Sequence, residues 1–190
     1  MRLSAASSSK ISVVLITHNE GLNLRLTVEN LQETLPAAHE ILVVDDRSSD
    51  RSTDFLNYTA GPVRLVRPQR RLGVAGARNY GARRANGGVI VFCDAHISLP
   101  RGWDRPMLDL LEDPLIGAVA PCISDRGARH RKGFGLRPRG PDLDIEWLNR
   151  KGNDPYPVPL LPGACMAMRR DVFQAAGGFD RGLIRYGVED

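Results

Sequence analysis

Cysteine, lysine and long hydrophobic runs are all scarce in this sequence of 190 residues, and each shortage narrows the possible classes of protein. The three cysteines, Cys93, Cys122 and Cys165, form no CxxC pair and are odd in number. A disulfide framework or a zinc site is therefore not expected, which fits a reducing compartment. No apolar run approaches membrane-spanning length, and the polar start MRLSAASSSK contains no hydrophobic signal region. We expect a cytoplasmic protein whose membrane contact, if any, is peripheral.

Nearly all of the basic residues are arginine rather than lysine. The formal net charge is +4. Arginine suits bidentate contacts to phosphate, although a bias of the source genome explains the same composition. The arginines are scattered rather than gathered into one run, so nucleic acid is not an expected partner. The length suits one domain with a sizeable core. We predict a disordered polar tail over residues 1–10 and a single domain over 11–190.

Short apolar segments rich in β-branched residues alternate with segments of helical periodicity. Four segments are predicted to be buried strands, namely 11–16, 41–44, 63–66 and 89–93. After the first strand, one apolar helix face is formed by residues spaced four, three and four apart, which are Leu24, Val28, Leu31 and Leu35, and Pro36 ends this helix. Strands that alternate with helices imply βαβ units, so the fold class is α/β, with a Rossmann-like, mainly parallel sheet flanked by helices.

The remaining segments are read from their cap residues and composition. Ser49 and Asp50 are predicted to cap a short helix, and the small-residue segment 72–88 is predicted to be a helix packed closely on the sheet. Residues 122–159 are rich in Gly, Pro and Arg, which predicts a long loop or a pair of short irregular elements over the site. A further strand in GACMAMRR and a short helix that ends near Gly177 complete the domain.

Three polar clusters follow directly after three of the predicted strands: THNE (17–20), DDRSSD (45–50) and DAH (94–96). In an open parallel sheet, ligands bind beyond the carboxyl ends of the strands, where the strand order reverses. If the order is three, two, one, four, the first and fourth strands flank that crevice. A polar turn after one strand is common, but three clusters that converge on one place indicate a ligand site.

The residue types in these clusters favour a diphosphate held through a metal. The first turn lacks G-x-G-x-x-G, which disfavours a dinucleotide-dependent dehydrogenase. Asp94 and His96 can both turn toward one ion if the strand breaks there, and mixed oxygen and nitrogen ligation suits Mn²⁺ better than Ca²⁺. Asp45 or Asp46 can accept hydrogen bonds from a base or a ribose. Arg78 is either a phosphate ligand or a solvated charge on the helix face.

Four blocks of the sequence resemble, in order, the motifs of the GT-A-fold family 2 glycosyltransferases. They are SVVLITHNEGLNLRLTVENL, EILVVDDRSSDRSTD, RLGVAGARNYGARRANGGVIVFCDAHI and PGACMAMRRDVFQAAGGFDRGLIRYGVED. In that family the first two blocks hold the nucleotide of a sugar donor, the D-x-D block binds metal and diphosphate, and the E-D block supplies the catalytic base. The resemblance implies a GT-A catalytic domain over residues 11–190. The donor-binding residues that we predict are Thr17, His18, Asn19, Glu20, Asp45, Asp46, Ser48, Arg78, Asp94, Gly163 and Ala164.

The resemblance also implies chemical roles. Asp94 and His96 are the predicted ligands of Mn²⁺ or Mg²⁺, which neutralises the leaving diphosphate. Asp190 is the predicted base for the acceptor, and Glu189 orients it or binds the acceptor. Turn residues Gly163 and Ala164 leave room for the sugar beside the backbone, although Gly163 alone is also explained by a turn before a strand. A UDP-sugar is the expected donor, and the acceptor is a carbohydrate, a lipid or a protein.

The chain departs from the family pattern at two points. Its metal motif is D-x-H, which also resembles that of the polypeptide N-acetylgalactosaminyltransferases, a group of retaining enzymes, whereas Glu189 and Asp190 fit the inverting enzymes better. The sequence stops at Asp190, where the family continues with a helix and an acceptor segment, so we expect a truncated domain. The alternatives are a retaining transferase, a nucleotidyltransferase, and an inactive module that binds a nucleotide sugar or a partner protein.

Overall fold

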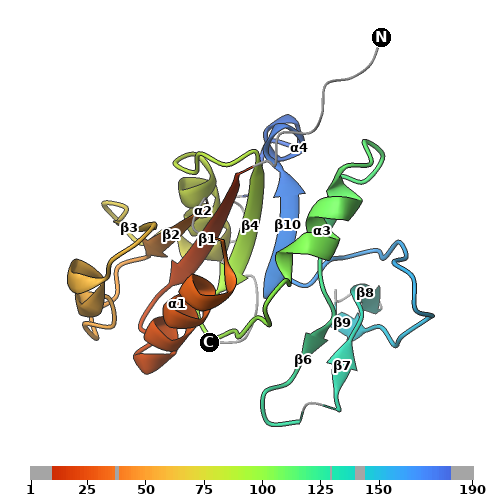
Figure 1. The fold of residues 1–190 in the computed structure, drawn as a ribbon, viewed down its shortest axis with the longest axis horizontal. Coiled ribbons are helices and arrows are strands. Elements are labelled where there is room, and N and C mark those ends of the chain that lie inside the picture. Colours follow the sequence, from red (N-terminus) through yellow and green to blue (C-terminus); the bar gives the residue numbers. More distant parts are fainter. Residues whose placement is uncertain (1–9, 37–38, 129, 140–143, 181–190) are drawn as a thin grey trace.

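The computed structural model describes residues 10–36, 39–128, 130–139 and 144–180 (Figure 1). Its centre is a six-stranded sheet in the order β3-β2-β1-β4-β10-β5. The strands of this sheet are β1 (Ile11–Thr17), β2 (Glu40–Asp45), β3 (Val63–Val66), β4 (Val89–Asp94), β5 (Ala118–Val119) and β10 (Cys165–Arg169). Strands β1 to β4 run parallel to one another, whereas β10 is antiparallel to both β4 and β5. The order three, two, one, four, which was the condition for placing the first and fourth strands beside the predicted crevice, is the order observed.

Helices cover both faces of this sheet, because alternate side chains of a strand point to opposite faces. Helices α1 (Leu22–Thr34) and α3 (Asp104–Leu111) pack against Val13 and Leu15 on one face. On the other face, α2 (Gly73–Ala82) and α4 (Arg170–Ala175) pack with Val14. Figure 1 shows α1 and α3 in front of the sheet. The predicted α/β class with a mainly parallel sheet is therefore confirmed.

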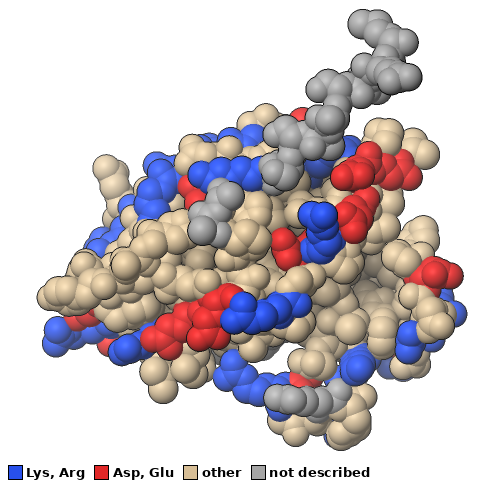
Figure 2. Space-filling view, in the orientation of Figure 1, with Lys and Arg blue, Asp and Glu red and all other residues tan. Residues whose placement is uncertain are grey.

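Small residues in α2 bring this helix close to the sheet, as the composition of segment 72–88 predicts. A Cβ atom at Gly81 would collide with Val14 of β1 and Val44 of β2. The start of α2 lies next to the polar cluster after β2, because Asp46 accepts the N–H groups of Leu72 and Gly73. On the face shown in Figure 2, acidic and basic side chains lie next to one another rather than gathering into a patch of one sign.

Other expectations need correction. Ser49 and Asp50 do not cap a helix, because the short helix that follows is the 3₁₀ helix η1 (Asp54–Tyr58) and begins after Thr53. Residues 122–159 contain two small antiparallel sheets, formed by β6 (Ile123–Ser124) with β7 (Lys132–Gly133) and by β8 (Leu136–Arg139) with β9 (Asp144–Trp147).

Helix α3 was not predicted, although its signal is present in the sequence. Trp103, Met107 and Leu111 are spaced four apart and are all buried in the core beside α1. Among the described residues, no helix has the length and apolar character needed to cross a membrane.

Candidate functional site

The three polar clusters meet where the strand order reverses between β1 and β4. The register pairs Thr17 at the end of β1 with Asp45 at the end of β2, and it pairs Ile16 with Asp94 at the end of β4. These carboxyl ends therefore lie at one edge of the sheet, as ligand-binding strands of an open α/β sheet do. The fold brings the three predicted clusters together in one region, although they are up to 79 positions apart along the chain.

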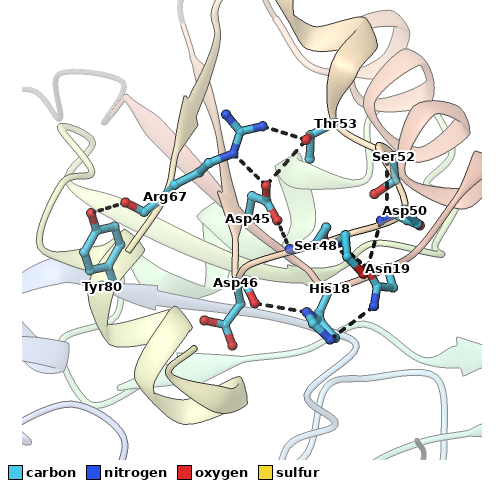
Figure 3. A network of polar contacts seen from close by, with 11 residues as sticks. His18, Asn19, Asp45, Asp46, Ser48, Asp50, Ser52, Thr53, Arg67 and Tyr80 are labelled. Carbon is cyan, nitrogen blue, oxygen red and sulfur yellow. Dashed lines mark hydrogen bonds and ion pairs between the residues drawn. The ribbon is translucent and has the colours of Figure 1, made fainter. Parts of the chain in front are cut away.

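The loops after β1 and β2 are tied together through Asn19 (Figure 3). Its side-chain oxygen accepts hydrogen bonds from the backbone N–H groups of Ser49 at 2.7 Å and Asp50 at 3.3 Å, and its own N–H donates to the Ser48 hydroxyl at 3.0 Å. The N–H of Gly21 donates to the Asp50 carboxylate at 2.9 Å. Asn19 has a left-handed backbone with φ of 58°, which asparagine tolerates better than most residues. These hydrogen bonds hold the first two clusters together as one unit.

Asp45 is buried and is already bound by protein groups. Burial alone would raise its pKa, but hydrogen bonds from the Arg67 guanidinium and from Ser48 outweigh burial, so the pKa of Asp45 is lowered. The Arg67 Nε lies 2.7 Å from one carboxylate oxygen, the Ser48 N–H lies 2.8 Å from the other, and Arg67 also reaches the Thr53 hydroxyl at 2.7 Å. Arg67 and Thr53 were not predicted, because the pairing depends on strand order and not on sequence spacing.

Asp46 stabilises the start of α2. Its carboxylate accepts the backbone N–H groups of Leu72 at 2.7 Å and Gly73 at 2.9 Å, where a helix leaves its first donors unpaired. The backbone oxygen of Asp46 lies 3.0 Å from the Nδ1 atom of His18. Both predicted nucleotide-binding aspartates thus lie at the carboxyl end of β2 and make protein contacts there.

Arg78 is not the solvated helix-face charge that was one of its two predicted roles. Its side chain is 7% exposed, and one guanidinium nitrogen lies 3.1 Å from Asp94 Oδ1 and 2.9 Å from the carbonyl oxygen of Gly163. The ring of Phe179 lies 5.5 Å from the guanidinium carbon. The Asp94 N–H also donates to the carbonyl oxygen of Ala164 at 3.1 Å. Arg78 therefore joins the end of β4 to the turn before β10.

Asp94 and His96 stand where β4 ends and the chain turns. The His96 side chain is half exposed, and its Nδ1 atom lies 3.3 Å from the Glu20 carboxylate. Among the described residues, no group of three or more His, Cys, Asp or Glu side chains is arranged to hold a metal. A pair consisting of one carboxylate and one imidazole fits an ion that completes its coordination with diphosphate oxygens and water, such as Mn²⁺ or Mg²⁺. The donor set is thus suited to an ion shared with a ligand.

Two further observations bear on the predicted residues. The Thr17 hydroxyl, at the end of β1, is buried and has no hydrogen-bond partner among the described residues. The predicted catalytic residues Glu189 and Asp190 lie outside the described residues, so their roles stay predictions.

The mainly parallel six-stranded sheet, with its reversal of strand order between β1 and β4, is an α/β architecture of the GT-A type. A family model described as Glycosyl transferase family 2 matches residues 12–177. The chain belongs to this family, which confirms the resemblance seen in the sequence.

Curated relatives of this chain include proteins named polypeptide N-acetylgalactosaminyltransferases. Polypeptide N-acetylgalactosaminyltransferase 15 of Mus musculus is 32% identical over 194 residues, which cover 89% of this chain and 30% of the relative. Putative polypeptide N-acetylgalactosaminyltransferase 13 of Drosophila melanogaster is 32% identical over 212 residues, which cover 98% of this chain and 38% of the relative. The chain thus spans about a third of the length of these relatives.

Solved structures share the fold. GalNAc-T7 with UDP, GalNAc and Mn²⁺ is 26% identical with a TM-score of 0.78, and the match covers 95% of this chain and 38% of that chain. The mannosyltransferase PcManGT from Pyrobaculum calidifontis, in complex with GDP-Man and Mn²⁺, is 22% identical with a TM-score of 0.67, and the match covers 91% of this chain and 48% of that chain. Both likenesses support the GT-A assignment of the fold.

Proposed function

We propose that this protein is a metal-dependent glycosyltransferase that moves a sugar from a nucleotide-diphosphate donor, a UDP-sugar, to an acceptor nucleophile. The observation that carries the proposal is the convergence of the three polar clusters at the reversal between β1 and β4, with Asp94 and His96 at the end of β4. The relative solved with UDP, GalNAc and Mn²⁺ supports a UDP-sugar and a divalent ion.

Asp94 and His96 are the proposed ligands of Mn²⁺ or Mg²⁺. When bound, the ion supplies Lewis-acid stabilisation of the negative charge that develops on the leaving diphosphate. The chain's own groups position this pair, because Arg78 contacts the Asp94 carboxylate and Glu20 contacts the His96 ring. The Thr17 hydroxyl and the loops after β1 and β2, which Asn19 joins by hydrogen bonds, border the space proposed for the nucleotide.

Inversion at the anomeric carbon is the proposed stereochemistry, with Asp190 as the base. In this reaction the acceptor oxygen forms a bond to the anomeric carbon as the bond to the diphosphate breaks, and Asp190 takes the acceptor proton. A retaining transferase is the second candidate, because the D-x-H motif resembles that of polypeptide N-acetylgalactosaminyltransferases. The names of the curated relatives favour a protein acceptor over a carbohydrate or a lipid.

Two measurements test this function. Calorimetric titration with UDP is expected to show tighter binding with Mn²⁺ than without it, and Asp94→Ala should remove most of that gain. The matched control is Asp109→Ala on α3, whose carboxylate is 66% exposed and belongs to none of the three clusters. Equal UDP affinity with and without Mn²⁺ would contradict the metal role.

The second measurement is sugar transfer from UDP-N-acetylgalactosamine to a peptide rich in serine and threonine, with the anomeric configuration of the product read by NMR. A β-linked product from the α-linked donor supports inversion, and an α-linked product supports the retaining candidate. UDP binding that is strengthened by Mn²⁺ without transfer to any acceptor would instead support a nucleotide-sugar-binding module.

A further inference from the structure

Glu20 and His96 are 76 positions apart in the sequence, and their side chains face each other at the carboxyl edge of the sheet. The Nδ1 atom of His96 lies 3.3 Å from one carboxylate oxygen of Glu20 and 3.4 Å from the other. The ring therefore presents one nitrogen to the carboxylate, and its Nε2 atom is on the opposite side of the ring. Nδ1 is therefore held by Glu20, and Nε2 is the nitrogen that can face a ligand.

The backbone on both sides of Glu20 is fixed by the loop after β2. Asn19 is bound through its N–H and its side-chain oxygen to residues 48–50, and the N–H of Gly21 donates to Asp50 at 2.9 Å. The carbonyl oxygen of Glu20 accepts the N–H of Asn23 at 3.0 Å, at the start of α1. The Glu20 carboxylate is thus presented by an anchored turn.

Helix α1 also fixes the turn that carries His96. The buried Thr27 hydroxyl lies 3.0 Å from the carbonyl oxygen of Ala95 and 3.1 Å from that of Ile97, the two residues that flank His96. One turn further along α1, the Asn30 side chain exchanges two hydrogen bonds with the backbone of Leu99. The turn with Glu20 and the turn with His96 are therefore both hydrogen-bonded to the same helix, α1.

The anchored backbone on both sides distinguishes the Glu20–His96 pair from an ordinary surface contact. Exposed ion pairs contribute little, because ordering two long side chains offsets the attraction. Here the backbones on both sides are already ordered by other bonds, so less freedom remains to be lost. A carboxylate that accepts the N–H of one imidazole nitrogen fixes the tautomer and makes the other nitrogen the metal ligand.

We propose that Glu20 is a positioning residue that holds the His96 proton on Nδ1, so that Nε2 is the atom that binds the divalent ion. This inference rests on the proposed function, since it assigns a role at the same metal site. It changes the role predicted for Glu20 from a donor-binding residue to a partner of the metal ligand.

The tautomer of His96 is measured first, on metal-free protein labelled with ¹⁵N-histidine. At about pH 8, above the ordinary histidine pKa near 6.5, long-range ¹H–¹⁵N correlation spectra distinguish the two neutral tautomers. The parent protein is expected to show the Nδ1–H form of His96, and Glu20→Ala is expected to lose that preference. His18 is an internal control, because its Nδ1 contacts the Asp46 carbonyl oxygen at 3.0 Å and does not depend on Glu20. An Nε2–H tautomer in the parent, or an unchanged tautomer in Glu20→Ala, would overturn the inference.

Metal affinity is measured next, by Mn²⁺ electron paramagnetic resonance titration in the presence of UDP. Loss of a group that orients a metal ligand lowers metal affinity roughly 10–100-fold, which is the loss expected for Glu20→Ala. Glu20→Gln should retain most of the affinity, because its amide oxygen can still accept the Nδ1–H. Glu29→Ala is the matched control, since Glu29 lies on the exposed side of α1 and pairs with Arg25.

The outcomes separate this inference from the function on which it rests. If the parent binds no Mn²⁺ with UDP, the metal-dependent function itself fails. If the parent binds Mn²⁺ and Glu20→Ala binds it equally well, only the role of Glu20 fails. If Glu20→Gln loses as much affinity as Glu20→Ala, Glu20 is a direct ligand of the ion and not a positioning residue.

Discussion

The guanidinium of Arg78 lies 3.1 Å from the carboxylate of Asp94, and the same nitrogen lies 2.9 Å from the carbonyl oxygen of Gly163. This contact joins helix α2, the end of β4 and the turn before β10. Because the Arg78 side chain is almost fully buried, the pair is held in a fixed geometry and is poorly screened by solvent. The proposed metal ligand Asp94 is thus oriented by a buried cation.

The first prediction concerns the space around this cation. A Cβ atom at Gly163 would lie 3.0 Å and 3.1 Å from the two terminal nitrogens of Arg78, so Gly163→Ala should displace the guanidinium from Asp94. Arg78→Lys keeps the charge but cannot reach both partners, and we expect a loss of about 1.5–3 kcal/mol, typical of a hydrogen bond to a charged group. Both variants should lower the urea midpoint of unfolding.

A double-mutant cycle checks whether the two changes act through the same contact. The losses of Gly163→Ala and Arg78→Lys should be less than additive when combined, because either change alone already disturbs the contact with Asp94. Gly152→Ala is the matched control, since a Cβ atom there meets nothing within 4 Å. Fully additive losses, or a Gly163→Ala variant as stable as the control, would show that this turn does not depend on Arg78.

The second prediction uses the lowered pKa of Asp45. A carboxylate whose folded-state pKa lies below its ordinary value of 3.8 adds stability above pH 3.8, and this stability is lost as the pH falls through the folded-state pKa. Asp45→Asn removes the charge that Arg67 contacts, so the variant should be less stable than the parent at neutral pH. The difference should shrink as the pH falls below 3.8. Urea unfolding of both proteins across this range measures it, and a difference that does not change with pH would refute the assignment.

The sequence predicts the sheet, and the edge of the sheet that carries the candidate site, because both depend on local patterns. Apolar β-branched runs fix where strands lie, and polar residues directly after them mark the carboxyl edge. The contacts within the site depend on strand order and loop conformation, which bring together residues far apart in the chain. Arg67 reaches Asp45 across 22 positions, and His96 reaches Glu20 across 76.

Arg78 illustrates the same limit on a helix. Its sequence neighbourhood allowed both a phosphate contact and a solvated charge, since periodicity alone does not say which polar residue a helix buries. The structure buries it because α2 packs closely on β1 and β2 through small residues such as Gly81, which turns Arg78 toward the end of β4. Asp46 is a second case, since its role at the start of α2 requires the helix to begin beside β2.

The third prediction concerns the three thiols. Cys93 and Cys165 are paired across β4 and β10, both are buried, and their sulfur atoms lie 3.9 Å apart. The hydrogen bond with Cys165 and burial raise the pKa of Cys93 well above its ordinary value, whereas Cys122 is exposed. Because the thiolate is the reactive form, iodoacetamide at about pH 8 should label only Cys122 in the native protein. Mass spectrometry should find one label before unfolding in urea and three after it; rapid labelling of Cys93 in the native protein would contradict this environment.

The last prediction concerns His96→Asp, which converts D-x-H to the commoner D-x-D motif of the family. An aspartate there is an adequate ligand for Mn²⁺, so metal-strengthened UDP binding should be retained. It also places a carboxylate at the turn that faces Glu20, and like charges repel when no cation lies between them. The metal-free variant should therefore be less stable than the parent, and Mn²⁺ with UDP should stabilise the variant more than it stabilises the parent.

Combining His96→Asp with Glu20→Gln should remove this loss of stability in the metal-free protein, because the second substitution removes one of the two charges. Thermal unfolding of the four proteins, with and without Mn²⁺ and UDP, measures both effects. A deficit that persists in the double variant would mean that charge repulsion with Glu20 is not its cause, and loss of Mn²⁺-dependent UDP binding in His96→Asp would mean that the site requires the imidazole itself.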